Sequence, residues 1–382
     1  MSSDLAFYVH VPYCVRRCGY CDFNTYTPAE LAISSDLSGV SRSYIDLLIH
    51  EIDLARATSR ATQVPTIFFG GGTPTLMEPS DLGRVITAIS DRFEIASDAE
   101  ITIEANPDTV TPQKLEALRA AGFNRISFGM QSAATHVLAA LDRTHNPENV
   151  TTSVLAARSA GFDEVSVDLI YGTPGESIKD WSQTLDTALA LPITHISAYA
   201  LIVEQGTKLG AQVKRGEVVM PDDDETADKY LLADERFEAA GFSWYELSNW
   251  SKPGSQSRHN MAYWLGTNWW GAGPGAHSHL DGRRFWNVKH PNAYKERFLS
   301  TGNPMAEEEL LTEAAKQSES VMLRIRLREG ISAAAFGSDV VLRLSDYVAQ
   351  GYLDESGWSQ GRVVLTRTGR LIADRIVREI VL

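Results

Sequence analysis

The stretch YVHVPYCVRRCGYC, residues 8–21, holds all three cysteines of a 382-residue chain, at Cys14, Cys18 and Cys21. The count is odd and the C-x3-C-x2-C spacing is too short for a disulfide framework, so the pattern favours a metal site. Three thiolates can hold a [4Fe–4S] cube by three of its irons, which leaves the fourth iron open to a small ligand. The loop therefore predicts an incompletely ligated iron–sulfur cluster.

Zinc bound by the three cysteines and His10 is the alternative. A structural zinc site prefers four ligands, usually from two separated C-x2-C pairs, and the second pair is missing here. Iron–sulfur ligation is the better fit to this spacing.

Composition and charge restrict the class of partner. The formal net charge is −14, whereas nucleic-acid binding normally requires a basic face, so we expect no nucleic-acid partner. The start of the chain has neither a basic region nor a long apolar run, and no stretch approaches the length of a membrane span. We therefore expect a cytoplasmic protein of two or three domains that acts on a small molecule or a protein.

Short β-rich runs alternate with helix-length amphipathic segments. The runs cover residues 6–10, 66–69, 101–104, 125–128, 164–169 and 195–201. Similar segments around Gly122, Gly161 and Gly241 each read as a helix end, a glycine cap and a strand. This alternation predicts an α/β fold with a parallel sheet. The repeat is barrel-like, although a doubly wound sheet would give similar unit lengths.

Polar residues gather at the ends of these runs. GGGTP, residues 70–74, follows the second run, Glu104 ends the third, and Asp168 lies near the end of the fifth. In a βα barrel this edge binds ligands, and glycines let backbone approach a ligand closely. Taken singly, GGGTP could be a tight turn, the two acids could be solvated, and Arg143 could be a surface charge.

Several motifs resemble one family when taken in order. These are the cysteine stretch, FFGGGTP, IEANP at residues 103–107, GMQS at 129–132 and VDLIYGTPG at 167–175. They are similar to the radical S-adenosylmethionine family, in its branch that resembles oxygen-independent coproporphyrinogen III oxidase. The resemblance covers about the first 250 residues and continues beyond them.

The resemblance implies a partial (β/α)6 barrel with the cluster at its mouth, held by Cys14, Cys18 and Cys21. S-adenosylmethionine would chelate the open iron and be reduced to methionine and a 5′-deoxyadenosyl radical, in a barrel that excludes water. The expected contacts to this cofactor, or to a second molecule of it, are Tyr8, Tyr20, Gly71, Gly72, Thr73, Glu104, Gln131, Arg143, Asp168 and Ala200.

Departures from the oxidase pattern point to one group within the branch. The oxidase has a further cysteine where this chain has Phe23, and it has a long extension where only thirteen residues precede Cys14. SRHNMAYW, residues 257–264, resembles the HNxxYW signature of HemW-type haem chaperones. We therefore expect a radical S-adenosylmethionine protein without coproporphyrinogen oxidase activity.

Aromatic side chains crowd the HNxxYW region. Six of the eight tryptophans fall within it, at Trp244, Trp250, Trp264, Trp269, Trp270 and Trp286. Aromatic walls suit a flat macrocycle and an imidazole suits its iron, so His259 is the leading candidate haem ligand, with His10 second. The alternative is a plain aromatic core with His259 buried and hydrogen-bonded.

The remaining chain predicts a small winged-helix-like α+β domain at residues 306–382, after a barrel at 1–240 and the aromatic-rich region at 241–305. A helix is expected over 307–326 and a hairpin over 353–366. The presumed recognition helix carries one arginine, so a lid or docking surface is a better interpretation than DNA reading.

Two functions follow from these observations. The first is a haem-binding chaperone that transfers haem to an acceptor protein and carries a [4Fe–4S] cluster and S-adenosylmethionine. The second is an oxygen-independent coproporphyrinogen III oxidase. Phe23 and the HNxxYW segment favour the first. The sequence identifies no acceptor, and it leaves open a homodimer and a peripheral membrane contact.

Overall fold

The computed structural model describes residues 4–34 and 38–381, and its main body is a twelve-stranded, curved sheet. The strand order is β12-β11-β10-β9-β1-β2-β3-β4-β5-β6-β8-β7, and β9 and β1 to β6 run parallel. The strands are β1 (Ala6–Val11), β2 (Gln63–Gly71), β3 (Glu94–Ala105), β4 (Arg125–Gln131), β5 (Glu164–Tyr171), β6 (His195–Ala200), β7 (Ser243–Glu246), β8 (Asn249–Ser251), β9 (Trp269–Ala272), β10 (His277–Leu280), β11 (Arg283–Asn287) and β12 (Met305–Leu310).

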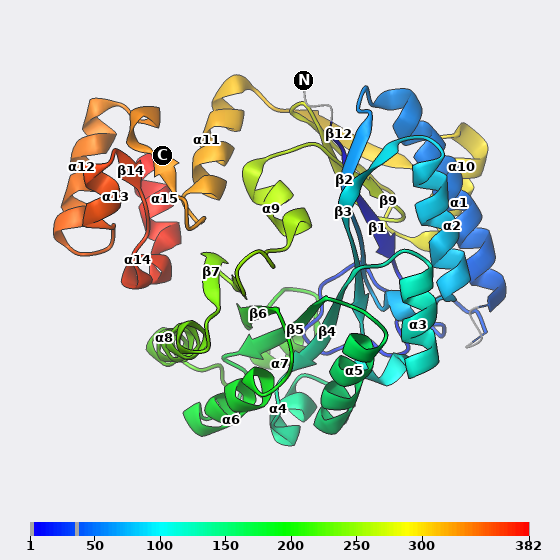
Figure 1. The fold of residues 1–382 in the computed structure, drawn as a ribbon, viewed down its shortest axis with the longest axis horizontal. Coiled ribbons are helices and arrows are strands. Elements are labelled where there is room, and N and C mark those ends of the chain that lie inside the picture. Colours follow the sequence, from blue (N-terminus) through cyan, green and yellow to red (C-terminus); the bar gives the residue numbers. More distant parts are fainter. Residues whose placement is uncertain (1–3, 35–37, 382) are drawn as a thin grey trace.

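Helices line the outer side of the sheet, and α9 lies on its inner side (Figure 1). The helices of this body are α1 (Ser38–Thr58), α2 (Pro79–Ser90), α3 (Pro112–Ala120), α4 (Thr135–Ala140), α5 (Pro147–Ser159), α6 (Ile178–Leu189), α7 (Lys208–Lys214), α8 (Asp223–Ala239), α9 (Arg258–Leu265) and α10 (Pro291–Thr301), with 3-10 turns at Pro74–Leu76 and Pro107–Thr109. The main core lies between this outer layer and the sheet, and includes Phe7, Phe69 and Phe128.

The predicted α/β fold is confirmed. All six predicted β runs are strands, and they lie side by side in chain order from β1 to β6. A doubly wound sheet reverses its strand order part-way, so this sequential order corresponds to a barrel. The barrel is partial because β12 and β7 form the two ends of the sheet.

The three glycine repeats mark equivalent turns between a helix and a strand. Gly122, Gly161 and Gly241 all have positive φ, at 110°, 91° and 79°, a conformation that glycine adopts without a Cβ penalty. The first two lead into β4 and β5. The third leads into β7, which β8 separates from β6, so this unit departs from the simple barrel repeat.

The last part of the chain has a core of its own, which includes Ile325, Leu344 and Ile376. Its elements are α11 (Glu313–Arg324), β13 (Ile331–Ser332), a 3-10 turn at Ala333–Ala335, α12 (Ser338–Ala349), α13 (Glu355–Ser359), β14 (Arg362–Val363), α14 (Arg367–Leu371) and α15 (Ala373–Val381). Helices α12 to α15 lie together at one end of the molecule in Figure 1. The predicted domain boundaries and the winged-helix-like class stay predictions.

Two local predictions in this region are confirmed only in part. Residues 307–310 belong to strand β12, because Glu308 and Glu309 form ion pairs with Arg283 and Arg284 on β11, and the expected helix begins at Glu313. The two ends of the expected hairpin do pair, through an antiparallel bridge between Leu353 and Leu365, but α13 lies between them and β14 pairs with β13. At β12 a partner distant in sequence overrides local propensity.

A buried charge cluster docks the terminal part on α8. Asp234 accepts hydrogen bonds from the Arg370 guanidinium at 2.7 and 2.8 Å, and Trp250 donates its indole N–H to the same carboxylate at 2.8 Å. The Arg370 guanidinium also lies 4.4 Å from the Trp244 ring centroid. Breaking one partner of such a buried pair would leave an uncompensated charge, so this contact fixes the terminal part on the barrel.

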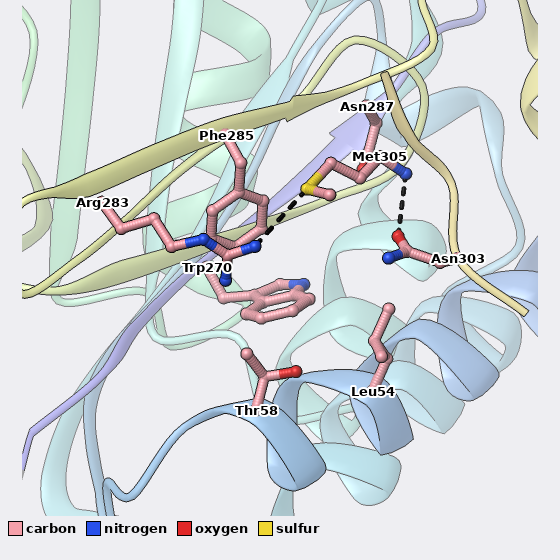
Figure 2. Close-up of a pocket in the computed structure, with 8 residues that line it drawn as sticks. All are labelled: Leu54, Thr58, Trp270, Arg283, Phe285, Asn287, Asn303 and Met305. Carbon is pink, nitrogen blue, oxygen red and sulfur yellow. Dashed lines mark hydrogen bonds between the residues drawn. The ribbon is translucent and has the colours of Figure 1, made fainter. Parts of the chain in front are cut away.

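The outer face of strands β9 and β11 packs on α1. Figure 2 shows this contact, where Trp270 and Phe285 face Leu54 and Thr58 around a cavity of about 30 Å³. Such a space holds about one water molecule. This face of the sheet is therefore filled, and the opposite face carries Trp269, His277 and Trp286.

Candidate functional site

The cysteine loop follows β1 and is shaped by its own backbone. The Cys14 N–H donates to the Tyr26 carbonyl at 3.0 Å, and the Tyr26 N–H donates to the Pro12 carbonyl at 2.7 Å. Cys14, Cys18 and Cys21 are free thiols and half-buried. The loop thus presents three thiols at the carboxyl end of a central strand.

Gly19 fixes the middle of this loop against the barrel. Its N–H donates to the Leu141 carbonyl at 3.2 Å, and its carbonyl accepts the Leu209 N–H at 2.8 Å. A Cβ at this position would run into the Asp142 carboxylate. A larger residue here would therefore have to displace the Asp142 carboxylate.

Two side chains donate to the cysteine sulfurs. The Thr73 hydroxyl lies 3.8 Å from Cys14 Sγ, and Arg143 Nη1 lies 3.6 Å from Cys18 Sγ. Burial raises the pKa of the Cys14 thiol to about 11, although the Thr73 hydrogen bond opposes this shift. Metal binding would therefore release protons from this loop, and the two donors would stabilise the resulting thiolates.

The structure bears on the zinc alternative through His10. In the described ranges no group of three His, Cys, Asp or Glu side chains is arranged to hold a metal ion. His10, the fourth ligand of the zinc alternative, has both ring nitrogens in hydrogen bonds, to the Tyr8 hydroxyl at 3.0 Å and the Asn24 carbonyl at 2.9 Å. The ligand assignment itself stays a prediction.

The glycines of GGGTP have a packing reason. Gly71 has a φ of 109°, and a Cβ there would lie 2.5 Å from two atoms of the His10 ring. The Gly72 N–H donates to the Val11 carbonyl at 2.7 Å, and the Thr73 N–H donates to the Tyr13 carbonyl at 2.8 Å. These bonds place the end of β2 directly beside the cysteine loop. The segment is therefore more than an isolated turn.

Two half-buried carboxylates face the interior of the barrel. Glu104 accepts the Gly71 N–H at 3.1 Å, and Asp168 accepts the Ser127 hydroxyl at 3.0 Å. Burial, followed by the nearby Asp168 charge, raises the pKa of Glu104 to about 8, and burial also raises the pKa of Asp168. Neither forms an ion pair within the described chain. Such carboxylates suit an ammonium group or ribose hydroxyls.

Gln131 combines backbone strain with an unmatched polar atom. Its φ is +56°, and its buried side-chain Oε1 has no hydrogen-bond partner in the described structure. Arg143, beside it, donates to the Gly129 carbonyl at 3.0 Å. Buried polar atoms are usually paired, so Oε1 is available to accept a hydrogen bond from a ligand at this edge.

The structure brings the remaining predicted contacts to the same edge of the sheet. Tyr20 lies in the cysteine loop, Tyr8 lies on β1 two residues before His10, and Ala200 is the last residue of β6. Because β1 to β6 are parallel, their carboxyl ends share one edge. The predicted positions therefore converge in space, while their roles stay predictions.

The HNxxYW segment forms α9, which begins after the capping residue Ser257. His259 is 2% exposed. Its Nδ1 lies 2.8 Å from the Thr66 hydroxyl, and its Nε2 lies 3.0 Å from the Tyr263 hydroxyl. The ring also stacks on Phe68 at 5.1 Å, and burial lowers its pKa to about 3. His259 is thus a neutral imidazole with both nitrogens occupied.

Glu100 anchors the start of α9, although it was not among the site residues predicted from the sequence. Its carboxylate accepts the backbone N–H groups of Arg258 and His259 at 2.9 and 3.0 Å, and it forms an ion pair with buried Arg125 at 3.7 Å. Glu100 stands four residues before Glu104 in β3, and side chains at even spacings share one face of a strand. That spacing was the available signal for Glu100.

Comparison with known proteins identifies the family. Residues 8–188 match the Radical SAM superfamily. The chain is 47% identical to a Heme chaperone HemW of Mycobacterium tuberculosis, over 97% of this chain and 93% of that protein. It is 32% identical to the Heme chaperone HemW of Bacillus subtilis, over 97% of each. The chain belongs to the HemW family of radical SAM proteins.

The fold of the chain agrees with its membership of the HemW family. The structure of coproporphyrinogen III oxidase (HemN) from Escherichia coli superimposes with a TM-score of 0.82 at 22% identity, covering 98% of this chain and 89% of that chain. At this identity the likeness concerns the fold alone. A [4Fe–4S] cluster and S-adenosylmethionine are typical of the radical SAM superfamily. Within the described residues of this HemW-family chain, no helix is both long and apolar enough for a membrane span.

Proposed function

We propose that the protein binds haem and transfers it to acceptor proteins. The observation that carries this proposal is the similarity to relatives named Heme chaperone HemW along 97% of the chain. A similarity of this extent includes the HNxxYW segment and the terminal part as well as the barrel. Haem is the cargo in this proposal, and the acceptor is a protein that the chain does not identify.

The proposal includes a [4Fe–4S] cluster on Cys14, Cys18 and Cys21. Thr73 and Arg143 support this assignment because they donate to two of the sulfurs. When bound, such a cluster supplies an electron for reductive cleavage of S-adenosylmethionine. The barrel wall around β1 to β6 would keep water away from that position.

S-adenosylmethionine would lie beside the strand ends. Glu104 and Asp168 offer carboxylates to its ammonium group or hydroxyls, and Gln131 offers a buried carbonyl oxygen without a partner. The other proposed contacts are Tyr8, Tyr20, Gly71, Gly72, Thr73, Arg143 and Ala200. This part of the proposal depends on the unpaired Gln131 Oε1 and on two carboxylates that form no ion pair within the described chain.

A second candidate function is oxygen-independent oxidation of coproporphyrinogen III, which the fold shared with HemN favours. Phe23 argues against it. This residue replaces the additional cysteine of the oxidase pattern, and 61% of its surface is exposed beside the cysteine loop. We therefore propose that the protein lacks this enzymatic activity.

One anaerobic experiment on the cluster-reconstituted protein separates the two functions. Ferric haem is titrated in one arm, and coproporphyrinogen III with S-adenosylmethionine and a reductant is supplied in the other. We expect a Soret shift in the first arm and no protoporphyrinogen IX in the second. Robust product without a Soret shift would contradict the haem proposal.

We further propose a cytoplasmic location without a nucleic-acid partner. A homodimer and a peripheral membrane contact remain compatible with the structure. Sedimentation of the reconstituted protein with and without S-adenosylmethionine would establish the oligomeric state.

A further inference from the structure

His259 is poorly prepared to ligate an iron atom. Its two nitrogens are occupied by Thr66 and Tyr263, and its ring is covered by Phe68. To bind haem through Nε2, it would have to give up the Tyr263 hydrogen bond in a buried place. Leaving buried polar groups unpaired is costly, so a histidine whose ring nitrogens are free is a better candidate ligand.

All nine histidines lie in the described part of the chain. Both ring nitrogens are hydrogen-bonded in His10, His145, His259 and His279. One ring nitrogen is engaged in His50, His136, His195 and His290. His277 alone has neither nitrogen in a hydrogen bond or ion pair. Its imidazole is therefore the one in which either nitrogen can offer a lone pair without breaking a contact.

His277 is exposed, and its ring is oriented by a tryptophan. The ring stacks on Trp286 of the neighbouring strand, with centroids 5.4 Å apart and planes inclined by 21°. Its backbone carbonyl accepts the Trp269 indole N–H at 2.9 Å. Among the exposed histidines this combination of a free imidazole and a tryptophan partner distinguishes His277 from a solvated surface residue.

The surroundings of His277 suit a flat aromatic ligand. Gly271 pairs with Tyr8, and a Cβ on Gly271 would run into the His277 backbone, so β10 passes close to the inner face of β9 and β1. Trp269 packs edge-on against Tyr263 of α9, with centroids 4.9 Å apart. Trp269 therefore contacts both the HNxxYW helix, through Tyr263, and the backbone of His277. The opposite face of these strands is closed by α1 (Figure 2).

The charges around His277 are mixed, with Glu309 among them, and one of the cations has no acidic partner in the described chain. Desolvation, followed by the positive charges of Lys289 and Arg284, lowers the pKa of His277. Arg284 is paired with Glu309 at 2.7 Å and Glu319 at 2.6 Å. Lys289 is exposed and forms no ion pair within the described chain. Its ammonium group is therefore free to pair with a carboxylate such as a haem propionate.

We propose that His277 supplies the axial ligand to haem iron, on the face formed with Trp269 and Trp286, and that His259 instead holds α9 inside the barrel. The bond is a dative one from an imidazole nitrogen to the iron, so no electron or proton transfer is needed. This inference rests on the proposed haem function.

The test is a ferric haem titration of the full chain after cluster reconstitution. We expect His277→Ala to weaken haem binding by about tenfold or more and to lose the Soret shift. His277→Gly should regain the shift when free imidazole is added. His279→Ala is the matched control, because it removes a neighbouring histidine of the same strand whose nitrogens are already occupied, and it should bind as the unmodified chain does.

The outcomes separate this inference from the proposed function. Full haem binding by His277→Ala, with unchanged melting temperature, would overturn the inference and leave the haem function standing. A lack of haem binding by the unmodified chain would overturn both. Loss of haem binding in His277→Ala, together with recovery of binding in His277→Gly when imidazole is added, supports both the inference and the haem function. A merely structural role of His277 would not respond to imidazole.

Discussion

The mouth of the barrel and the HNxxYW segment are both rich in polar side chains, but they differ in where those side chains find partners. At the mouth, Gln131 Oε1 is buried and unpaired, and Glu104 and Asp168 form no ion pair in the described chain. In the HNxxYW segment, both nitrogens of His259 are paired, and Asn260 donates to Glu246 at 3.0 Å. The first region is therefore arranged for a ligand, and the second is arranged to hold the barrel together.

The variant Cys18→Ser tests the role of the barrel mouth and has the largest expected effect. If the mouth is the cluster site, the variant loses the iron–sulfur absorbance almost completely after anaerobic reconstitution, because two thiolates hold a cube poorly. Thr73→Val is the matched control, since it removes a donor to Cys14 but no ligand. Unchanged absorbance in Cys18→Ser would show that the ligand assignment is wrong.

The variant His259→Ala tests whether the HNxxYW segment stabilises the fold. We expect a loss of about 3 to 5 kcal/mol of stability, from two buried hydrogen bonds and an aromatic contact, with the cluster absorbance retained. Tyr263→Phe removes only one of the hydrogen bonds and should cost about 1 kcal/mol. Thermal unfolding followed by circular dichroism measures both. Equal stability of the alanine variant and the unmodified chain would contradict the structural role.

Glu51 lies outside both regions and predicts a dependence of stability on pH. It is buried on α1, accepts the Gly273 N–H at 2.8 Å and bonds Tyr294 at 2.5 Å. Burial raises its pKa to about 7, although its hydrogen bonds oppose the shift. The folded state therefore favours the protonated carboxyl, so this stability is present below the ordinary pKa and is lost as the pH rises through about 7.

The measurement for Glu51 compares melting temperatures with Glu51→Gln from pH 5 to pH 8. The unmodified chain should lose stability relative to the variant over this window, by about 3 kcal/mol at most. The glutamine variant cannot ionise, so it serves as its own control for the other titrating groups. A constant difference between the two proteins across the window would rule out the raised pKa.

Gln131→Ala gives the smallest expected effect at the mouth. Removing the unpaired carbonyl should weaken S-adenosylmethionine binding by about tenfold, which corresponds to about 1.4 kcal/mol, without loss of the cluster. Ser132→Ala is the neighbouring control, because that hydroxyl already bonds Thr184 at 3.1 Å. Equilibrium dialysis with labelled S-adenosylmethionine reports the difference. Equal affinities of the two variants would place the cofactor elsewhere.

The sequence by itself determined the alternation of strands and helices and the position of the cysteine loop. These features depend on short periodicities and on three cysteines within eight residues, which are local properties of the chain. The convergence of Glu104, Gln131 and Asp168 also followed, because parallel strands share one edge.

Only the tertiary structure decided which polar groups are satisfied. His259 finds Thr66 at a separation of 193 residues and Glu100 at 159, and no local pattern encodes such partners. Residues 307–310 form a strand because they pair with β11 and form ion pairs with two of its arginines. The sequence therefore identified His259 as notable, whereas the fold showed that its nitrogens are occupied and that those of His277 are free. Hydrogen bonding between distant residues is the physical reason for that difference.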